Sequence, residues 1–465
     1  MLADLHYLSL DEVAKRLMAR KITSVEVTEA ILDRIDKLDS RLKAFATITR
    51  EQALGEAKAR DAETAAGKSR GPLHGVPIAV KDLCNIAGVP TAAGMAIHRH
   101  NVPVKDSTVV ARLKAAGAVL LGKLQMTEGA FGRHHPSIAA PVNPWNENYW
   151  IGASSSGSGA ATAAGLCFAS LGSDTGGSIR YPSTMNGLTG LKPTWGRVSR
   201  AGVFALACSL DHIGPMARSA RDAALVLGVI AGADPDDPTA VPLPVPDYAG
   251  AIGAGVRGKR IGQPTNMPDL DQDSRGALEG GAAALRAAGA EIIDVALPAS
   301  FEQGGRDVLP LCSVETALAH EATYPSRAAE YGPVLASLID MGHRLSGIEL
   351  ARLQGRRAAL TGELNKLLAS IDLLLVPVMG TAVWTIKDIE AAGRDPETLA
   401  ARFRYTAPFN MSGQPTLTLP GGLNSDGVPI GFQIVSRAFD EAGILAAGHA
   451  YQQATDWHLR RPPVG

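Results

Sequence analysis

Residues 151-IGASSSGSGAATAAG-165 form a run of small side chains in the middle of the chain. A flexible linker would be polar on both sides, but this run continues directly into Ala160–Leu166, where alanine favours a helix. A helix N-terminus can bind a phosphate. However, the run lacks the Lys-Ser/Thr ending of a P-loop and the acidic residue of a dinucleotide site. The sequence therefore predicts a structured loop–helix junction and disfavours a nucleotide cradle.

A second glycine-rich run, 172-GSDTGGSIRYPS-183, follows a short way downstream. Gly176 and Gly177 precede Ser178, so backbone amides can approach a substrate there without hindrance from side chains. A hydroxyl next to consecutive N–H groups is what acyl transfer requires, namely a nucleophile and an oxyanion hole. The alternative is a tight Gly-Gly turn with an uninvolved serine, and that is the commoner case for this tripeptide alone.

A serine nucleophile needs a base, and none of the 11 histidines lies in a persuasive motif. Lys81 ends the apolar run 76-VPIAV-80, so it is expected at the C-terminal end of a buried strand. Burial lowers the pKa of a lysine and yields the neutral amine that can accept a proton. Taken alone, a lysine at a strand end is more often a solvated edge residue.

The rest of the chain alternates between helical and strand patterns, which predicts an α/β fold around a sheet. The first 60 or so residues are expected to be helical, with Ser9 and Glu12 at a capping-box spacing. By contrast, 188-LTGLKPTWGRVS-199 is broken by glycine and proline and is expected to be an irregular wall of the site. A proline-rich stretch at about 234–250 is the best linker candidate. The length of 465 residues suggests two or three domains or one large α/β domain.

Composition limits the function classes. With 46% hydrophobic residues and a formal net charge of −1, the chain has material for a large core and no general attraction to nucleic acid or acidic membranes. The four cysteines are far apart, so neither a zinc site nor a disulfide framework is expected. Free cysteines are typical of a reducing compartment, so we expect a cytoplasmic location. No apolar run approaches the ~20 residues of a membrane helix. No metal or organic cofactor is implied.

Four motifs together resemble the amidase signature family, and the similarity covers essentially the whole chain. They are 75-GVPIAVKD-82, the Ser/Gly run, 173-SDTGGSIRYPS-183 and 187-GLTGLKPTWGRVS-199. The resemblance implies the amidase-signature fold, a central mixed β-sheet flanked on both faces by helices. It implies a single domain over 1–465, with an N-terminal helical segment (1–65), a catalytic core (about 70–230), the proline-rich connection and a variable substrate funnel (about 300–405).

The family uses a Ser-cisSer-Lys triad, and the resemblance assigns its members one by one. Lys81 matches the catalytic lysine, Ser154 the bridging serine after a cis peptide bond, and Ser178 the nucleophile. The oxyanion hole is assigned to four backbone amides, those of Thr175, Gly176, Gly177 and Ser178. Three further residues match supporting positions: Ser155, Asp174 and Arg180.

The chain departs from the usual family pattern in three places. Ala153 and Ser156 stand where glycine is typical, and we expect both to be tolerated because the three triad positions are present. Relatives often carry Thr-Asn and an acidic-aromatic pair where this chain reads 124-LQMTEGAFG-132. That segment forms a substrate wall in the family, so substrate contacts are expected from four of its residues: Met126, Gly129, Ala130 and Phe131. A roomy, apolar site is expected rather than one tuned to a charged acyl group.

These assignments imply a serine hydrolase that cleaves apolar aryl or alkyl amides through an acyl-enzyme, and by the same chemistry esters or carbamates (urethanes). The expected partner is a small-molecule amide, and the expected assembly is a monomer or homodimer. The alternative is the component of a glutamine-dependent tRNA amidotransferase that liberates ammonia from glutamine, which would need partner subunits. A nucleotide-binding protein would leave Lys81 unexplained, and a catalytically dead scaffold is disfavoured because the whole triad is present.

Overall fold

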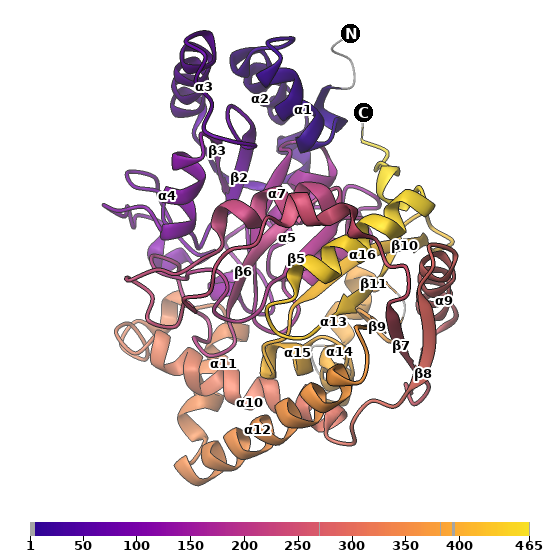
Figure 1. Cartoon of the computed structure of the whole chain (residues 1–465). Helices are drawn as coiled ribbons and strands as arrows, with labels where there is room; N and C mark the ends of the chain where they lie inside the picture. Colours follow the sequence, from indigo (N-terminus) through magenta and orange to yellow (C-terminus); the bar gives the residue numbers. More distant parts are fainter. Residues whose placement is uncertain (1–4, 269, 382, 393–395, 465) are drawn as a thin grey trace.

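The computed structural model describes residues 5–268, 270–381, 383–392 and 396–464. Within these residues one 11-stranded sheet runs through the molecule in the order β1-β3-β2-β4-β6-β5-β10-β11-β9-β7-β8 (Figure 1). Its strands are β1 (Phe45–Ile48), β2 (Pro77–Lys81), β3 (Val119–Leu124), β4 (Ala169–Asp174), β5 (Thr189–Lys192), β6 (His212–Ala217), β7 (Arg260–Pro264), β8 (Glu291–Val295), β9 (Leu373–Pro377), β10 (Thr416–Leu423) and β11 (Pro429–Val435). Strand β2 runs parallel to both β3 and β4, whereas β4 and β6 are antiparallel, so the sheet is mixed.

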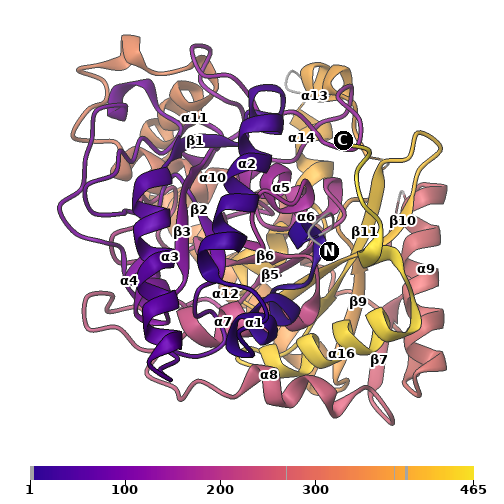
Figure 2. The same cartoon turned by 90° about the horizontal axis from the view of Figure 1, so that it is seen from above.

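Helices surround this sheet. They are α1 (Leu10–Met18), α2 (Ser24–Leu42), α3 (Arg50–Ala65), α4 (Thr108–Ala115), α5 (Ser156–Ala163), α6 (Arg180–Met185), α7 (Ala220–Ile230), α8 (Tyr248–Ala251), α9 (Gln272–Ala287), α10 (Phe301–Ala319), α11 (Pro333–Arg344), α12 (Gly347–Ala369), α13 (Ile386–Ala392), α14 (Pro396–Phe403), α15 (Ala407–Met411) and α16 (Glu441–Ala454). Seen from above, α2 and α3 lie toward one end of the sheet and α9 toward the other (Figure 2). The α/β fold expected from the sequence is confirmed.

The N-terminal segment begins as its capping residues predict. The Ser9 hydroxyl accepts a hydrogen bond from the Glu12 amide at 3.1 Å, which caps α1. Helix α2 starts after Thr23, which forms a reciprocal capping box with Glu26. The expectation of an all-helical segment is wrong at β1, a four-residue strand that pairs antiparallel with β3 at the edge of the sheet.

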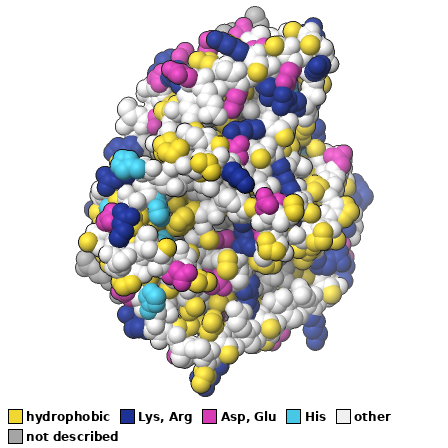
Figure 3. All heavy atoms as spheres, turned by 90° about the vertical axis from the view of Figure 1, so that its left-hand side faces the viewer, with side chains coloured by type: hydrophobic (Ala, Val, Ile, Leu, Met, Phe, Trp, Pro, Cys, Tyr) yellow, Lys and Arg dark blue, Asp and Glu magenta, His cyan; other side chains and the backbone are white. Residues whose placement is uncertain are grey.

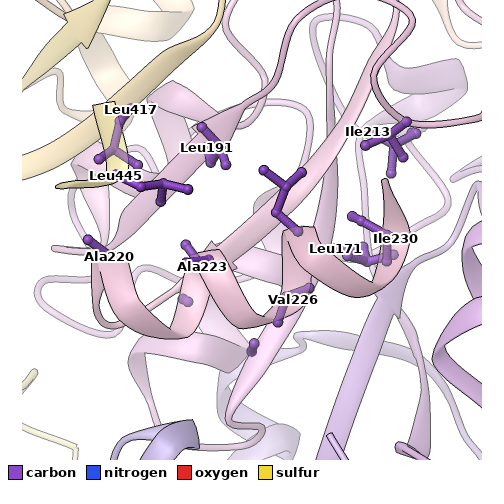
Figure 4. Close-up of a cluster of buried hydrophobic side chains, with 14 of the residues drawn as sticks. Leu171, Leu191, Ile213, Ala220, Ala223, Val226, Ile230, Leu417 and Leu445 are labelled. Atoms are coloured by element: carbon purple, nitrogen blue, oxygen red, sulfur yellow. The ribbon is translucent and has the colours of Figure 1, made fainter. Parts of the chain in front are cut away.

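Successive residues of a strand point to opposite faces of the sheet, so neighbouring residues of β4 contact different helices. Leu171 of β4 points toward α7 and shares a buried cluster with side chains of β5, β6, β10 and α16 (Figure 4). Its neighbour Gly172 faces the other side, where a Cβ would lie 2.9 Å from the Ser155 hydroxyl at the start of α5. The small-residue junction and the Leu-rich core thus lie on opposite faces of the same strand.

The stretch 188–199 is only partly the irregular wall that the sequence suggested. It contains β5, a fully buried strand between β6 and β10 near the middle of the sheet. Gly190 lies in this strand because a Cβ there would collide with the Ser183 side chain of α6. The glycine therefore marks a close approach of helix to strand and not a break in the sheet.

The proline-rich connection joins α7 to α8 along the surface and is held to the body. The Val241 amide donates to the Gly196 carbonyl at 2.8 Å, and the Arg197 guanidinium donates to the Pro244 carbonyl at 3.1 Å. The strands before and after the connection belong to one sheet.

The surface shows the charge balance of the composition. On the face drawn in Figure 3, Lys and Arg side chains are interspersed with Asp and Glu. Among the described residues, no helix has the length and apolar character needed to cross a membrane.

Candidate active site

Lys81 is the last residue of β2, and its side chain is fully buried. Its Nζ donates hydrogen bonds to three hydroxyl oxygens, at 2.6 Å to Ser154, 2.9 Å to Ser155 and 2.8 Å to Ser173. We call these four residues the lysine cluster. The expected position of Lys81 at a buried strand end is confirmed, and the alternative of a solvated edge lysine is excluded.

Burial dominates the protonation of Lys81. Loss of hydration lowers the pKa of its amine to about 7, although the negative charges that Cys84, Asp174 and Asp211 can carry act in the opposite direction. A protonated amine offers three donors, which matches the three hydroxyls of the cluster. In the neutral amine one of those hydroxyls must instead donate to the Nζ lone pair, so a proton can pass between lysine and serine along an existing hydrogen bond.

Ser154 and Ser155 lie in the loop that enters α5. The Ala153–Ser154 peptide bond is cis, as the resemblance implies. Gly152 has a φ of +90°, and a Cβ there would collide with Pro182. Ala153, which stands where glycine is usual in the family, lines the neighbouring cavity and is buried in a hydrophobic cluster. The hydroxyl of Ser156 lies 2.9 Å from His134 Nε2, so the second departure also finds a partner.

Ser178 lies in the loop between β4 and α6, which Asp174 organises. One carboxylate oxygen of Asp174 accepts from the Gly177 amide at 2.8 Å, and the other accepts from the Ile179 amide at 3.0 Å. The Arg180 guanidinium donates to both oxygens, at 2.8 and 3.0 Å, and both side chains are fully buried. Burial alone would raise the pKa of Asp174, but the charge and hydrogen bonds of Arg180 outweigh it, so the net pKa is lowered.

The backbone amides of residues 175–178 differ in whether they already donate a hydrogen bond within the protein. The Gly177 amide is already bonded to Asp174. Within the described part of the chain, the amides of Thr175, Gly176 and Ser178 donate to no protein group, and the Ser178 hydroxyl also makes no hydrogen bond. Of the four amides assigned to the oxyanion hole, three are therefore available to a ligand and one is committed to the loop.

A cavity of about 450 Å³ opens at Ser178. Its wall includes the 175–178 loop, the segment 130–133, the side of α10 around Val308 and Cys312, and residues of α13 and α14. The structure brings Ala130 and Phe131 to this wall, as expected. It does not bring Met126 and Gly129 there. Met126 is fully buried in the core. Gly129 packs against α11, where a Cβ added to the glycine would lie 2.8 Å from the Leu335 side chain.

The sequence reasoning missed two contributors to the site. Ser173, the third hydroxyl on Lys81, sits at the end of β4, which is parallel to β2. Parallel neighbours end at the same edge of a sheet, so a polar residue ending an adjacent strand was the signal that could have found it. Arg402 of α14 lines the cavity, and no local motif marks it.

Comparison with known proteins agrees with this arrangement. The family model Amidase matches residues 26–445. A Mycobacterium tuberculosis protein that carries the name amidase AmiD is 50% identical over 464 residues, covering 98% of this chain and 96% of the relative. The glutamyl-tRNA(Gln) amidotransferase of a Roseiflexus species has a subunit that is 40% identical over 492 residues, covering 99% of each chain. The native peptide amidase of Stenotrophomonas maltophilia superimposes with a TM-score of 0.82 at 31% identity over 98% of each chain. The family model spans most of the chain, and the relatives are similar along its whole length. The protein therefore belongs to the amidase signature family and is an amide-hydrolysing enzyme.

Proposed function

We propose that the protein hydrolyses carboxylic amides through a Ser178 acyl-enzyme, with Lys81 as the base and Ser154 as the proton bridge. The observation that carries the proposal is the buried Lys81 amine, whose pKa of about 7 leaves much of it neutral near neutral pH, 2.6 Å from Ser154 Oγ. Ser178 stands at the cavity with an uncommitted hydroxyl, and the loop amides beside it are also uncommitted.

Acylation then follows in balanced steps. Ser178 Oγ attacks the amide carbon while its proton passes to Ser154 and the Ser154 proton passes to neutral Lys81. The amides of Thr175, Gly176 and Ser178 are available to stabilise the oxyanion. As the C–N bond breaks, the proton returns from Lys81 through Ser154 to the leaving nitrogen, which departs as a neutral amine.

Water completes the cycle. It attacks the acyl-enzyme carbonyl, and its proton follows the same path to Lys81. When the second tetrahedral intermediate collapses, Ser178 regains its proton through Ser154, and the acid product leaves. Ser155 and Ser173, which lie 2.9 and 2.8 Å from the lysine nitrogen, orient it for proton transfer. Asp174 and Arg180 keep the nucleophile loop in place.

The cavity supports a substrate with a sizeable apolar part. Its wall contains six hydrophobic side chains: Phe131, Leu206, Val308, Leu309, Cys312 and Phe403. Esters and carbamates present the same carbonyl to Ser178, and we include them as secondary substrates.

The second candidate is a glutamine-hydrolysing component of a tRNA amidotransferase. It is favoured by the 40% identity to the subunit of the Roseiflexus amidotransferase over nearly the full length of both chains. It differs from the first candidate in needing partner subunits and in using glutamine.

The test is an activity screen of the purified chain alone on anilides, short aliphatic amides, nitrophenyl esters and glutamine. Turnover of an anilide or aliphatic amide that disappears in Ser178→Ala supports the proposal. Ser326→Ala, which removes an exposed hydroxyl away from the cavity, is the control and should keep full activity. Retained turnover in Ser178→Ala would reject the assigned nucleophile, and glutaminase activity that appears only with partner subunits would favour the second candidate.

A further inference from the structure

Arg402 lies near the end of α14, and its guanidinium is held among aromatic rings on the cavity wall. Its Cζ lies 4.0 Å from the centroid of the Trp150 ring, 5.4 Å from that of Trp384 and 5.7 Å from that of Tyr181. These distances are within the range of cation–π contact. The rings hold the side chain in place and surround its flat cation, but they cannot satisfy its N–H donors.

The N–H groups of Arg402 have no acceptor in the described protein. Nε is buried and has no hydrogen-bond partner among the described residues. Burial lowers the pKa of Arg402 to about 10, so the group remains a cation at neutral pH. Two other charged residues, Arg133 and Glu390, line the same cavity, so its wall carries two cations and one carboxylate. The side chain is half-buried, with its Nε enclosed and the residue facing the cavity, so the guanidinium can bind an anion that enters the cavity.

Arg402 shares a wall with the nucleophile loop through Tyr181. The centroid of the Tyr181 ring lies 5.7 Å from Arg402 Cζ. The same ring packs so closely on Gly177 that a Cβ there would collide with it. The Tyr181 hydroxyl also donates to the Arg402 carbonyl at 2.7 Å, which fixes α14 to this ring. One aromatic side chain therefore contacts both the cation and the residue before Ser178.

We propose that Arg402 binds a carboxylate carried by the substrate, and that the enzyme prefers amides with an apolar body and an anionic end. The planar guanidinium fork matches a carboxylate in a two-bond arrangement, which lysine cannot reproduce. The apolar body would pack against Val308 and Cys312 while the amide carbonyl reaches Ser178. This inference rests on the proposed function and changes the expectation of a site with no charged subsite.

The experiment compares matched pairs of anilides. The malonyl, succinyl and glutaryl anilides carry a carboxylate on the acyl side, and each is paired with the anilide in which an isopropyl group replaces that carboxylate. The acetyl amides of 4-aminobenzoate and 4-isopropylaniline place the same difference on the amine side. Values of kcat/KM are measured for the unmodified enzyme, Arg402→Met and Arg402→Lys, with Arg327→Met as a control because Arg327 pairs with Glu330 outside the cavity.

We expect the unmodified enzyme to have a higher kcat/KM for at least one carboxylate substrate than for the matched neutral anilide. Arg402→Met should lower kcat/KM for that substrate by roughly tenfold to a hundredfold, the value of a hydrogen-bonded charge pair, and leave the neutral partner within about twofold. Arg402→Lys should retain part of the preference because it keeps the charge without the fork. A neutral partner that is preferred in both series would overturn the inference. The inference would also be overturned if Arg402→Met lowered kcat/KM equally for the carboxylate and the neutral anilide of a pair while its unfolding midpoint stayed unchanged.

A binding measurement separates this inference from the proposed function. Calorimetric binding of the same anilides to Ser178→Ala does not depend on turnover. If no amide is hydrolysed by the unmodified enzyme, the proposed function fails, but carboxylate binding that is lost in Ser178→Ala/Arg402→Met still supports the Arg402 subsite. Binding that is absent, or that is unchanged by Arg402→Met, counts against the subsite whatever the turnover result.

Discussion

Lys81 Nζ lies 2.6 Å from Ser154 Oγ, the shortest of its three hydrogen bonds. The contact joins the end of a parallel strand to the loop that begins α5. Both side chains are buried, so bulk water does not compete for the bond. A short bond between an amine of near-neutral pKa and a hydroxyl is the arrangement through which a proton can be exchanged at little cost.

The pH dependence of amide hydrolysis should report the protonation of Lys81. Its pKa of about 7 means that the fraction of neutral amine rises as the pH rises through that value. If the neutral amine is the base, kcat/KM should increase with pH and reach a plateau about one to two units above the pKa. A pH–kcat/KM profile on a neutral anilide measures this, since that substrate does not itself ionise. A profile that falls through pH 7 would contradict the role of Lys81.

Replacing Lys81 should affect amides more than activated esters. An amine leaving group needs the returned proton, whereas nitrophenolate leaves without one. We expect Lys81→Ala to lower kcat/KM for an anilide by about 10²–10⁴ and to lower that for the matching nitrophenyl ester clearly less. Measuring both substrates on the same protein preparation cancels differences in the folded fraction. Equal losses would show that Lys81 does not return a proton to the leaving group.

Ser173→Ala should move the pH profile. The Ser173 hydroxyl accepts a hydrogen bond from Lys81 Nζ at 2.8 Å, which favours the charged amine. Removing that acceptor should lower the pKa of Lys81, so the rise in kcat/KM should move to lower pH. Ser170→Ala is the matched control, because Ser170 lies on the same strand and bonds to Thr162 instead. An unmoved inflection in Ser173→Ala, with only a uniform loss of activity, would mean that Ser173 does not tune the lysine.

The sequence was sufficient where function depends on residues that are close in the chain. The apolar run before Lys81 identified both the strand and the buried position at its end. The loop containing Ser178 carries its own organising pair, since Asp174 and Arg180 flank the nucleophile and bond to each other. The strand end at Lys81 follows from the apolar run before it, whereas the supporting roles of Asp174 and Arg180 came from the resemblance to the amidase signature family.

The sequence was insufficient where the contact is made by distant segments. Ser173 acts on Lys81 because two strands happen to be neighbours, and Arg402 reaches the cavity because α14 packs against Tyr181. Strand β5 was missed because Gly190 resembles a strand breaker until the close approach of Ser183 is known. The edge strand β1 is too short to show a clear period, with only four residues.

Asp174→Asn should be strongly destabilising. Asp174 and Arg180 are both fully buried and joined at 2.8 Å, so the substitution leaves the arginine charge without its counter-ion. Breaking a buried pair from one side costs about 3–5 kcal/mol. The comparison is Asp36→Asn, whose exposed pairing with Arg50 should change the free energy of unfolding by less than about 1 kcal/mol. Urea unfolding of both variants measures the difference, and similar midpoints would mean that the Asp174 pair does not stabilise the fold.

Gly177→Ala should lower activity, whereas Gly228→Ala should leave activity unchanged and stabilise the fold. Gly177 has a φ of +137°, and an added Cβ would run into the Tyr181 ring, so Gly177→Ala should displace the nucleophile loop. We expect its kcat/KM to fall by at least about 10², because a 1 Å misplacement of reacting groups is enough for that loss. Gly228 lies in α7 with no atom within 4 Å of an added Cβ, so Gly228→Ala should keep full activity. It should also raise the free energy of unfolding by about 0.4–1 kcal/mol, since alanine loses less conformational freedom on folding. Full activity in Gly177→Ala would show that the loop conformation tolerates a side chain, and that the contact between Gly177 and Tyr181 does not position Ser178.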